Sequence, residues 1–267
     1  MKKLDKEQGI IKKDLTGMKI TLIRITFFLA LFLIWYLVVA ITQIPSYILP
    51  GPLDVFESFY IGFIKGNYLI SIFYSMIRVL TGYFMALGIG IVTGILLARY
   101  YFLDITFGRS ILSLQSIPSV AWVPLALLWF GISDNAVIFI IILEAVLPTA
   151  LSTKNAMKNI PSNLIKAAQT LGSRGLHLYK NVIIKAMIPE LVTGLRLSWA
   201  FAWRALIAGE LFVSGAGIGQ TLELGRALAD MSQVIAMITT IGIIGYFTEN
   251  VFFGIIEKRV RIAWGVE

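Results

Sequence analysis

The sequence predicts an all-α, polytopic membrane protein with about six transmembrane helices. Hydrophobic residues make up 58% of the 267 residues, and charged residues only 14%. The mean hydropathy is +0.83. A soluble globular domain carries about 25% charged residues, so a chain this apolar cannot cover itself with polar surface. The third observation is a set of six separated apolar stretches, each a candidate for one crossing.

The six stretches cover about residues 21–41, 71–98, 105–130, 136–151, 186–208 and 235–256. The first is longer than a signal-peptide core and has no small-x-small cleavage site after it, so we interpret it as a membrane helix. The third contains Pro118 and Pro124. Prolines are tolerated in membrane helices where neighbouring helices satisfy the freed backbone groups. The fourth is short, and it is kept because the charge pattern requires it.

The basic residues predict the orientation of these helices. Of the 23 lysines and arginines, 18 lie in the N-terminal segment, in alternate connections and in the C-terminal segment. We therefore expect the chain to lie in the inner or plasma membrane of the cell. The positive-inside rule then predicts that both termini are in the cytoplasm. The expected layout is a tail at 1–20, a membrane domain at 21–257 and a tail at 258–267. The net charge of +8 is then a topology signal and not a mark of nucleic-acid binding.

Several kinds of chemistry are excluded by composition. The chain has no cysteine and a single histidine, His177, so we expect no metal site and no enzyme centre. No G-x-x-x-x-G-K-[ST] motif occurs, so no cofactor, ATP included, is expected to bind through a P-loop here. The glycine-rich run Ser214–Gly219 is predicted to be an external bend or hinge, because neither a strand before it nor a helix after it is expected.

The connection at about 152–185 is the most informative segment. Pro161 and Ser162 form a helix-start signal, with Ser162 as a candidate cap. One helix face is predicted for Leu164, Ala167, Ala168 and Leu171. Gly172 follows in a C-cap position, and a second short helix at about 173–182 leads to Pro189 at the entry of the fifth crossing. The pattern favours docking against a partner and lying on lipid headgroups about equally.

Two motifs carry a family resemblance. The connection reads Lys-Ala-Ala-Gln-Thr-Leu-Gly at 166–172, with Ile188-Pro189 sixteen residues beyond the glycine. This resembles the "EAA" loop of ABC importer permeases. The segment Ser116–Ile132, together with Leu49–Pro52 and Gly194–Arg196, is similar to the nitrate, sulfonate, taurine and bicarbonate branch of that family. The resemblance covers most of the chain from about Pro50.

The resemblance implies a type I ABC importer permease fold and a role in ATP-driven import. It implies a homodimer, ATPase subunits that hold ATP and Mg, and an extracytoplasmic substrate-binding protein. The ATPase-coupling residues would be Lys166, Ala167, Ala168, Leu171, Gly172 and Pro189. The family's loop usually begins with an acidic residue, and Lys166 departs from it, which leaves the charge contact of that position open.

Charged residues inside predicted helices are candidates for the solute pathway. Ionisable residues in membrane helices usually face the bundle interior or an aqueous path. The candidate pathway residues are Arg196, Arg204 and Glu144. The two arginines either line the pathway and favour an anion, or pair structurally with a residue such as Glu144 or Glu249. The resembled branch suggests nitrate, sulfonate, taurine or bicarbonate, and a pyrimidine precursor or riboflavin is the alternative solute. The alternative function is a self-contained secondary transporter or channel.

Overall fold

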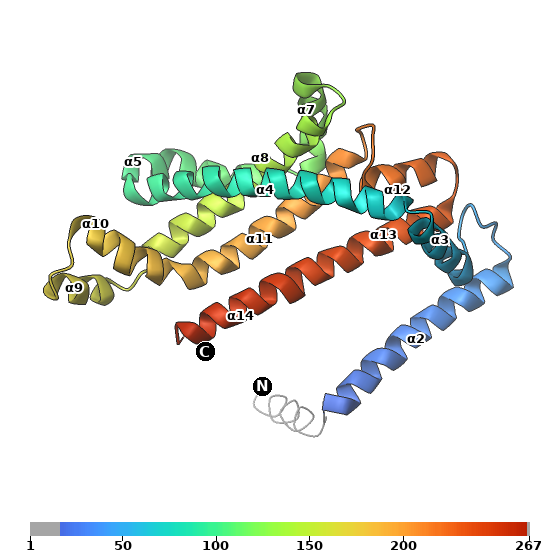
Figure 1. Cartoon of the computed structure of the whole chain (residues 1–267), viewed down its shortest axis with the longest axis horizontal. Helices are drawn as coiled ribbons and strands as arrows, with labels where there is room; N and C mark the ends of the chain where they lie inside the picture. The colour runs from blue at the N-terminus through green and yellow to red at the C-terminus, as the bar shows by residue number, and fades with distance from the viewer. Residues whose placement is uncertain (1–16, 266–267) are drawn as a thin grey trace.

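The computed structural model describes residues 17–265, and within them every regular element is a helix. Figure 1 shows long helices that run side by side, with short helices at both ends. In chain order the helices are α2 (Gly17–Thr42), α3 (Pro52–Ile64), α4 (Asn67–Arg99), α5 (Tyr101–Leu103), α6 (Arg109–Gln115), α7 (Val123–Phe130), α8 (Asp134–Lys158), α9 (Ser162–Thr170), α10 (Gly175–Leu178), α11 (Ile184–Glu210), α12 (Ile218–Ala227), α13 (Met231–Tyr246) and α14 (Gly254–Ala263). Tighter or wider turns join some of them: η1 (Asp104–Gly108), η2 (Ser119–Trp122), η3 (Tyr179–Ile183) and η4 (Phe247–Phe253). Residues 1–16 and 266–267, which belong to the two predicted tails, lie outside the described part.

Four described helical stretches are long and apolar enough to cross a membrane: Lys19–Thr42, Asn67–Arg99, Asp134–Lys158 and Met231–Ala263. A fifth is possible if the bent pair Tyr101–Gln115 and Ser119–Phe130 is one broken span. The helix α11 has 27 residues, and its charged residues lower its hydropathy. These long apolar helices confirm the polytopic all-α fold. The predicted count of about six crossings is reached only if the bent pair and α11 each cross the membrane.

Three local predictions differ from the structure. The third crossing is bent by 104°, because Pro118 adopts an extended backbone just before η2. The Pro-Gly-Pro turn at residues 50–52 is followed by the unpredicted helix α3, whose first residue is Pro52. The glycine-rich run leads directly into α12, so the expectation that no helix follows it was wrong.

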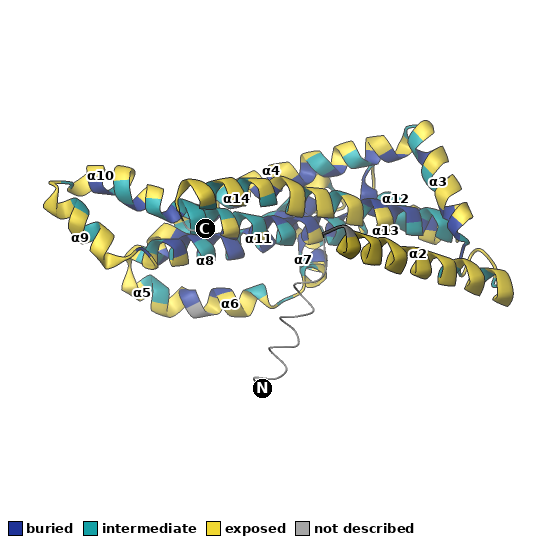
Figure 2. Ribbon diagram, turned by 90° about the horizontal axis from the view of Figure 1, so that it is seen from below, coloured by how far each residue is buried: buried dark blue, intermediate teal, exposed yellow. Residues whose placement is uncertain are grey.

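The core is made by α4, α8 and α11, which pack along their lengths. Figure 2 shows the buried residues concentrated on these helices. Small residues allow the close approach of α4 and α8. A side chain added at Gly90 would lie 2.6 Å from Thr149 Cβ, and one at Gly94 would lie 2.5 Å from the carbonyl oxygen of Ala150. A side chain added at Gly88, in the same helix, would have no such neighbour within 4 Å.

The helix α2 stands apart from the core. In its most apolar window no residue is buried inside the described structure, and Figure 1 shows it diverging from the other long helices. Its last turns are joined to the chain by Trp35, whose Nε1 donates to the carbonyl oxygen of Pro50 at 3.1 Å. Exposed apolar side chains around a long helix are typical of contact with lipid or with other membrane helices.

The two ends of the bundle carry different short helices. At one end α9 and α10, with η3, form a hairpin between α8 and α11 (Figure 1). We call this segment, residues 159–183, the hairpin, and its side of the molecule the hairpin end. The helices α3 and α12 lie at the opposite end.

Candidate functional site

The sequence predicts the position of the first hairpin helix correctly but not the residue that caps it. Helix α9 covers Ser162–Thr170, but its N-cap residue is Pro161 and no side chain caps it. Ser162 therefore does not act as the predicted cap. The second helix is α10, which passes through η3 into α11 without a break. Pro189 consequently lies inside α11 and not at its entry, because the predicted second helix and the fifth crossing are continuous.

The end of α9 is a Schellman-type cap. Gly172 adopts a φ of +87°, in the left-handed region that glycine enters without steric cost. The N–H of Ser173 donates to the carbonyl oxygen of Ala168 at 2.9 Å, and the N–H of Gly172 donates to Gln169 at 3.0 Å. The prediction of Gly172 as the stop of this helix is confirmed. The chain reverses here within a few residues, and Gly175 also has a positive φ of +54°.

The predicted apolar face of α9 is divided between two surroundings. Ile165 and Ala168 pack against a small core made by the hairpin and the adjacent ends of α8 and α11. Leu164, Ala167 and Leu171 are exposed, and Leu171 keeps 88% of its surface. Leu176 of α10, which the sequence analysis did not select, is exposed to the same 88%. Lys166 is also exposed. The hairpin therefore buries one side and leaves leucines on the other.

Polar contacts join the hairpin, and the helix ends beside it, to other parts of the chain. Arg99, the last residue of α4, donates from Nη1 to the Tyr179 hydroxyl at 2.8 Å. Trp264 donates from Nε1 to the carbonyl oxygen of Lys185 at 2.7 Å. Asp104 in η1 forms ion pairs with Lys154 and Lys158 at the end of α8. From the sequence these lysines are recognisable only as topology signals, because the aspartate that binds them is some fifty residues away in the chain.

Arg196 has structural partners on the C-terminal helices. Its Nη1 lies 3.1 Å from Glu257 Oε2, and its Nη2 donates to Asn250 Oδ1 at 3.0 Å. Glu257 also accepts from the Thr193 hydroxyl at 2.9 Å and pairs with Arg261 at 3.2 Å. The structural interpretation of Arg196 thus has support, but the partner is Glu257, and neither suggested partner, Glu144 or Glu249, pairs with it.

Arg204 and Glu144 lie near enough to interact electrostatically but differ in burial. The Arg204 side chain is exposed, its Nε donates to the carbonyl oxygen of Ala200 at 3.0 Å, and its guanidinium lies 4.6 Å from the Phe201 ring centroid. Glu144 on α8 keeps 5% of its surface. Within residues 17–265 no ion pair joins these two groups. Arg204 is therefore a cation at the surface of α11 with no carboxylate bound to it.

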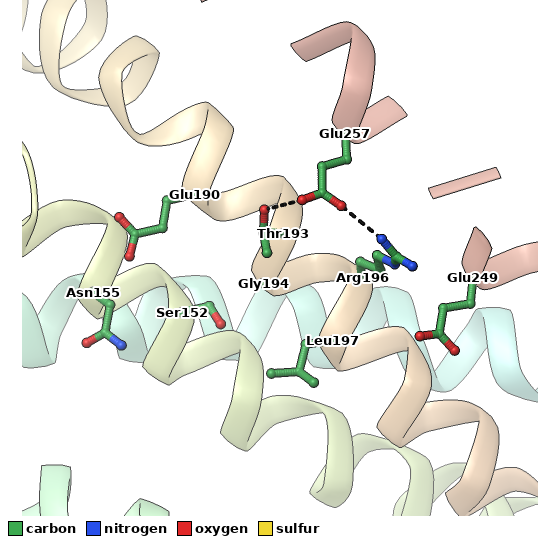
Figure 3. A pocket seen from close by; sticks show the side chains of 9 residues that line it. All are labelled: Ser152, Asn155, Glu190, Thr193, Gly194, Arg196, Leu197, Glu249 and Glu257. Atoms are coloured by element: carbon green, nitrogen blue, oxygen red, sulfur yellow. Dashed lines mark hydrogen bonds and ion pairs between the residues drawn. The ribbon is translucent and has the colours of Figure 1, made fainter. Parts of the chain in front are cut away.

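A groove runs along α11 where it faces α8 and the C-terminal helices. It consists of two hollows of about 420 Å³ and 410 Å³ that share Leu197 and Glu249. Figure 3 shows the first hollow, with the Arg196–Glu257 pair at its side and Glu249 next to it. The lining of the second contains Arg204 together with Trp199, Trp203 and Gly245. Of the three candidate pathway residues, Arg196 and Arg204 line this groove and Glu144 does not.

Comparison with known proteins identifies the family of such a chain. Residues 90–262 match the family described as binding-protein-dependent transport system inner membrane component. An ABC transporter permease protein of Methanocaldococcus jannaschii is 38% identical over 172 residues, which are 64% of this chain and 64% of that protein. The aliphatic sulfonates transport permease SsuC of Bacillus subtilis is 26% identical over 85% of this chain and 82% of its own. The taurine transport permease TauC of Escherichia coli is 28% identical over 81% and 80%.

Comparison of the fold with solved structures also identifies an ABC transporter. Inward-facing structures of the MetNI methionine ABC transporter include a chain that superposes with a TM-score of 0.61 at 19% identity, covering 72% of this chain and 95% of that one. The family consists of transport permeases and not of enzymes. The chain is a member of the binding-protein-dependent transport system inner membrane components, the membrane-embedded permeases of ABC importers, in the branch that includes nitrate, sulfonate and taurine permeases.

Proposed function

We propose that this chain is the translocating subunit of an ATP-driven importer and that the hairpin docks on a separate ATPase. The observation that carries the proposal is a short, capped helix whose leucines stay exposed at the end of two long helices. Burying a leucine contributes about 1.5–3 kcal/mol. Burial of Leu171 and Leu176 against a partner would therefore stabilise the complex. The family membership supports an ATPase as that partner.

The hairpin is suited to transmit force because it is joined closely to long helices on both sides. Its helix α9 begins three residues after the end of α8, and α10 passes through η3 into α11 without a break. We propose that ATP and Mg bind in the partner, and that closure of the ATPase pair moves the hairpins of two copies of this chain. Lys166, Ala167 and Leu171 would contact the partner, while Ala168 and Gly172 hold the shape of α9 and Pro189 lies in the transmitting helix.

The proposed topology places the hairpin end in the cytoplasm. The lysines of the hairpin and the basic C-terminal segment lie on that side, as the positive-inside rule requires. A substrate-binding protein would then deliver the solute at the opposite end, where α3 and α12 lie. The contact of Lys166 with the ATPase would need an acidic or neutral position on the partner surface.

A cross-linking experiment tests the docking. The chain contains no cysteine, so Leu171→Cys introduces the sole thiol. In the complex co-expressed with its partner ATPase, we expect a short bifunctional thiol–amine reagent to join this position to the ATPase subunit. Leu228→Cys is the matched control, an exposed leucine at the opposite end. Cross-linking from Leu228→Cys and not from Leu171→Cys would contradict the proposed docking. Solute uptake by the isolated chain without nucleotide would contradict the proposal and favour the secondary-transporter alternative.

We further propose that the solute is a small sulfonate, either an anion or a zwitterion such as an aminosulfonate. Arg204 is the cation of the groove without a bound carboxylate, and Glu249 lies in the same hollow. A guanidinium suits a sulfonate group and a carboxylate suits an ammonium group. The named relatives that transport sulfonates and taurine support this class. Nitrate and bicarbonate would use the cation alone.

Neutralising the two arginines separately distinguishes pathway from structure. We expect Arg204→Gln to lower uptake about tenfold with the complex assembled, since hydrogen bonds to charged groups contribute about 1.5–3 kcal/mol. Arg196→Gln should instead lower thermal stability, because it leaves Glu257 with fewer partners. Uptake and the melting temperature of the purified complex are the measurements. Unchanged uptake in Arg204→Gln would favour a neutral aromatic solute such as a pyrimidine precursor or riboflavin.

A further inference from the structure

A buried carboxylate joins three helices at the opposite end of the bundle. Glu210, the last residue of α11, keeps 1% of its surface. Its oxygens accept from the Ser75 hydroxyl at 2.7 Å and 2.8 Å, from Arg78 Nη1 at 2.7 Å and from the N–H of Gly219 at 2.9 Å. Ser75 and Arg78 belong to α4, and Gly219 belongs to α12. We call Ser75, Arg78 and Glu210 the Glu210 cluster.

The arginine of the cluster extends the connection to α8. Besides its contact with Glu210, Arg78 donates from Nε to Asp134 Oδ1 at 3.0 Å, and its Nη2 lies 2.7 Å from the same oxygen. Asp134 is the first residue of α8. Arg78 itself keeps 5% of its surface. One guanidinium from α4 therefore holds the end of α11 and the start of α8, the two helices that carry the hairpin at their other ends.

The start of α12 is held by the same cluster. The N–H of Ile218 donates to the Ser75 hydroxyl at 2.9 Å, and the N–H of Gly219 donates to Glu210. These are first-turn amides, which have no partner within their own helix. Gly217 allows the approach, because a side chain there would lie 2.6 Å from Arg78 Nη1 and 2.7 Å from Glu210 Cδ. The helix is thus attached by its first turn to a buried charge pair.

From α12 the connection continues to α13. Gln233 of α13 donates from Nε2 to the carbonyl oxygen of Thr221 at 2.7 Å, and α12 packs against both α11 and α13. The helices α11 and α13 line the groove that contains Arg204 and Glu249. The cluster is fully occupied by its own partners, so it has no place for a ligand. A buried ion pair also contributes little net stability compared with apolar residues, and its best-attested use is to specify one arrangement.

We propose that Arg78 and Glu210 are positioning residues that fasten α12 to α11, so that α13 follows α11 when the hairpin moves. The inference rests on the proposed function, because the movement starts at the hairpin. Without the cluster, Arg196 and Glu257 still join α11 to α14 near the hairpin end. At the opposite end, however, α12 and the start of α13 no longer move with α11, and the groove does not open to that side. ATP hydrolysis then continues without transport.

Two variants test this in the complete complex with its ATPase and binding protein. We expect Glu210→Gln to lower uptake about tenfold, a change within the usual range of coupling between distant sites. The ATPase rate should stay near the value of the unmodified complex. Glu223→Gln is the matched control, because Glu223 forms an exposed pair with Arg226 on α12 itself and should change neither rate. Gly217→Ala keeps every charge but forces the cluster apart, and it should reproduce the Glu210→Gln result if that variant fails to fold.

A chemical measurement separates positioning from a general loss of structure. Ile218 is fully buried at the start of α12, so Ile218→Cys should resist a membrane-impermeant maleimide. In combination with Glu210→Gln it should react, and with Glu223→Gln it should not. Uptake and Ile218→Cys protection that both survive Glu210→Gln and Gly217→Ala overturn the inference. Absence of a cross-link from Leu171→Cys in a complex whose Glu210 cluster is unchanged would instead overturn the proposed docking. The two failures are therefore distinguishable.

Discussion

Gly94→Ala is expected to lower the free energy of unfolding by about 1–3 kcal/mol, the usual cost of forcing extra volume into a packed interior. The new methyl group would lie 2.5 Å from the carbonyl oxygen of Ala150 and 2.5 Å from Thr153 Cβ. A backbone carbonyl cannot turn aside as the end of a long side chain can. The helices α4 and α8 would have to separate along the contact that forms the core.

The matched control is Gly88→Ala in the same helix. A methyl group at Gly88 meets nothing within 4 Å, and alanine is the better helix former. In detergent, we expect the melting temperature to fall by about 4–8 °C for Gly94→Ala if the loss is near 2 kcal/mol, and to change little for Gly88→Ala. Equal melting temperatures for the two variants would show that α4 and α8 do not pack as described.

Gly172→Val is expected to uncouple ATP hydrolysis from transport while the chain still inserts into the membrane. Gly172 ends α9 at a φ of +87°. An L-residue in the left-handed region loses about 1–2 kcal/mol, and a β-branched side chain is disfavoured there further. No neighbouring atom lies within 4 Å of a Cβ added at this position, so the effect acts on the backbone of the cap. The hairpin should change shape without disturbing the core.

Uptake should fall roughly tenfold in Gly172→Val, in line with the usual size of coupling between sites, while the ATPase subunit still hydrolyses ATP. Gly172→Asn is the control, because asparagine enters the left-handed region more readily than other side chains, and it should retain most of the uptake. Both rates are measured in proteoliposomes that contain the full complex. Normal uptake by a fully assembled Gly172→Val complex would refute the proposed role of the cap.

The features that the sequence predicts well are those decided over short distances in the chain. Gly172 was predicted correctly because a glycine after an amphipathic turn is a local signal of a C-cap. The same local reasoning misplaced Ser162, since Pro161 already occupies the N-cap position. It also overlooked α3, where a Pro-Gly-Pro turn hides a helix whose start is supported by Asp54 accepting from the N–H of Gly51 at 2.9 Å.

The contacts that the sequence could not predict join residues far apart. Arg78 and Glu210 are separated by 132 positions, and Arg196 and Glu257 by 61. Charge patterning identified Arg196 as costly inside a membrane, but its partner Glu257, like Glu210, lies just outside the predicted apolar stretches. Only the packing of α4 against α11, and of α11 against α14, decides which carboxylate each arginine meets.

The separation of α2 from the core has a consequence for how this chain responds to its lipid surroundings. The apolar stretch Lys19–Thr42 has 24 residues and rises about 36 Å, more than the ~30 Å of a typical hydrocarbon layer. No face of α2 is buried against the core, so bilayer thickness sets how far this helix leans. A change in acyl-chain length would reach the remainder of the protein through the Trp35–Pro50 hydrogen bond and the α2–α3 contact.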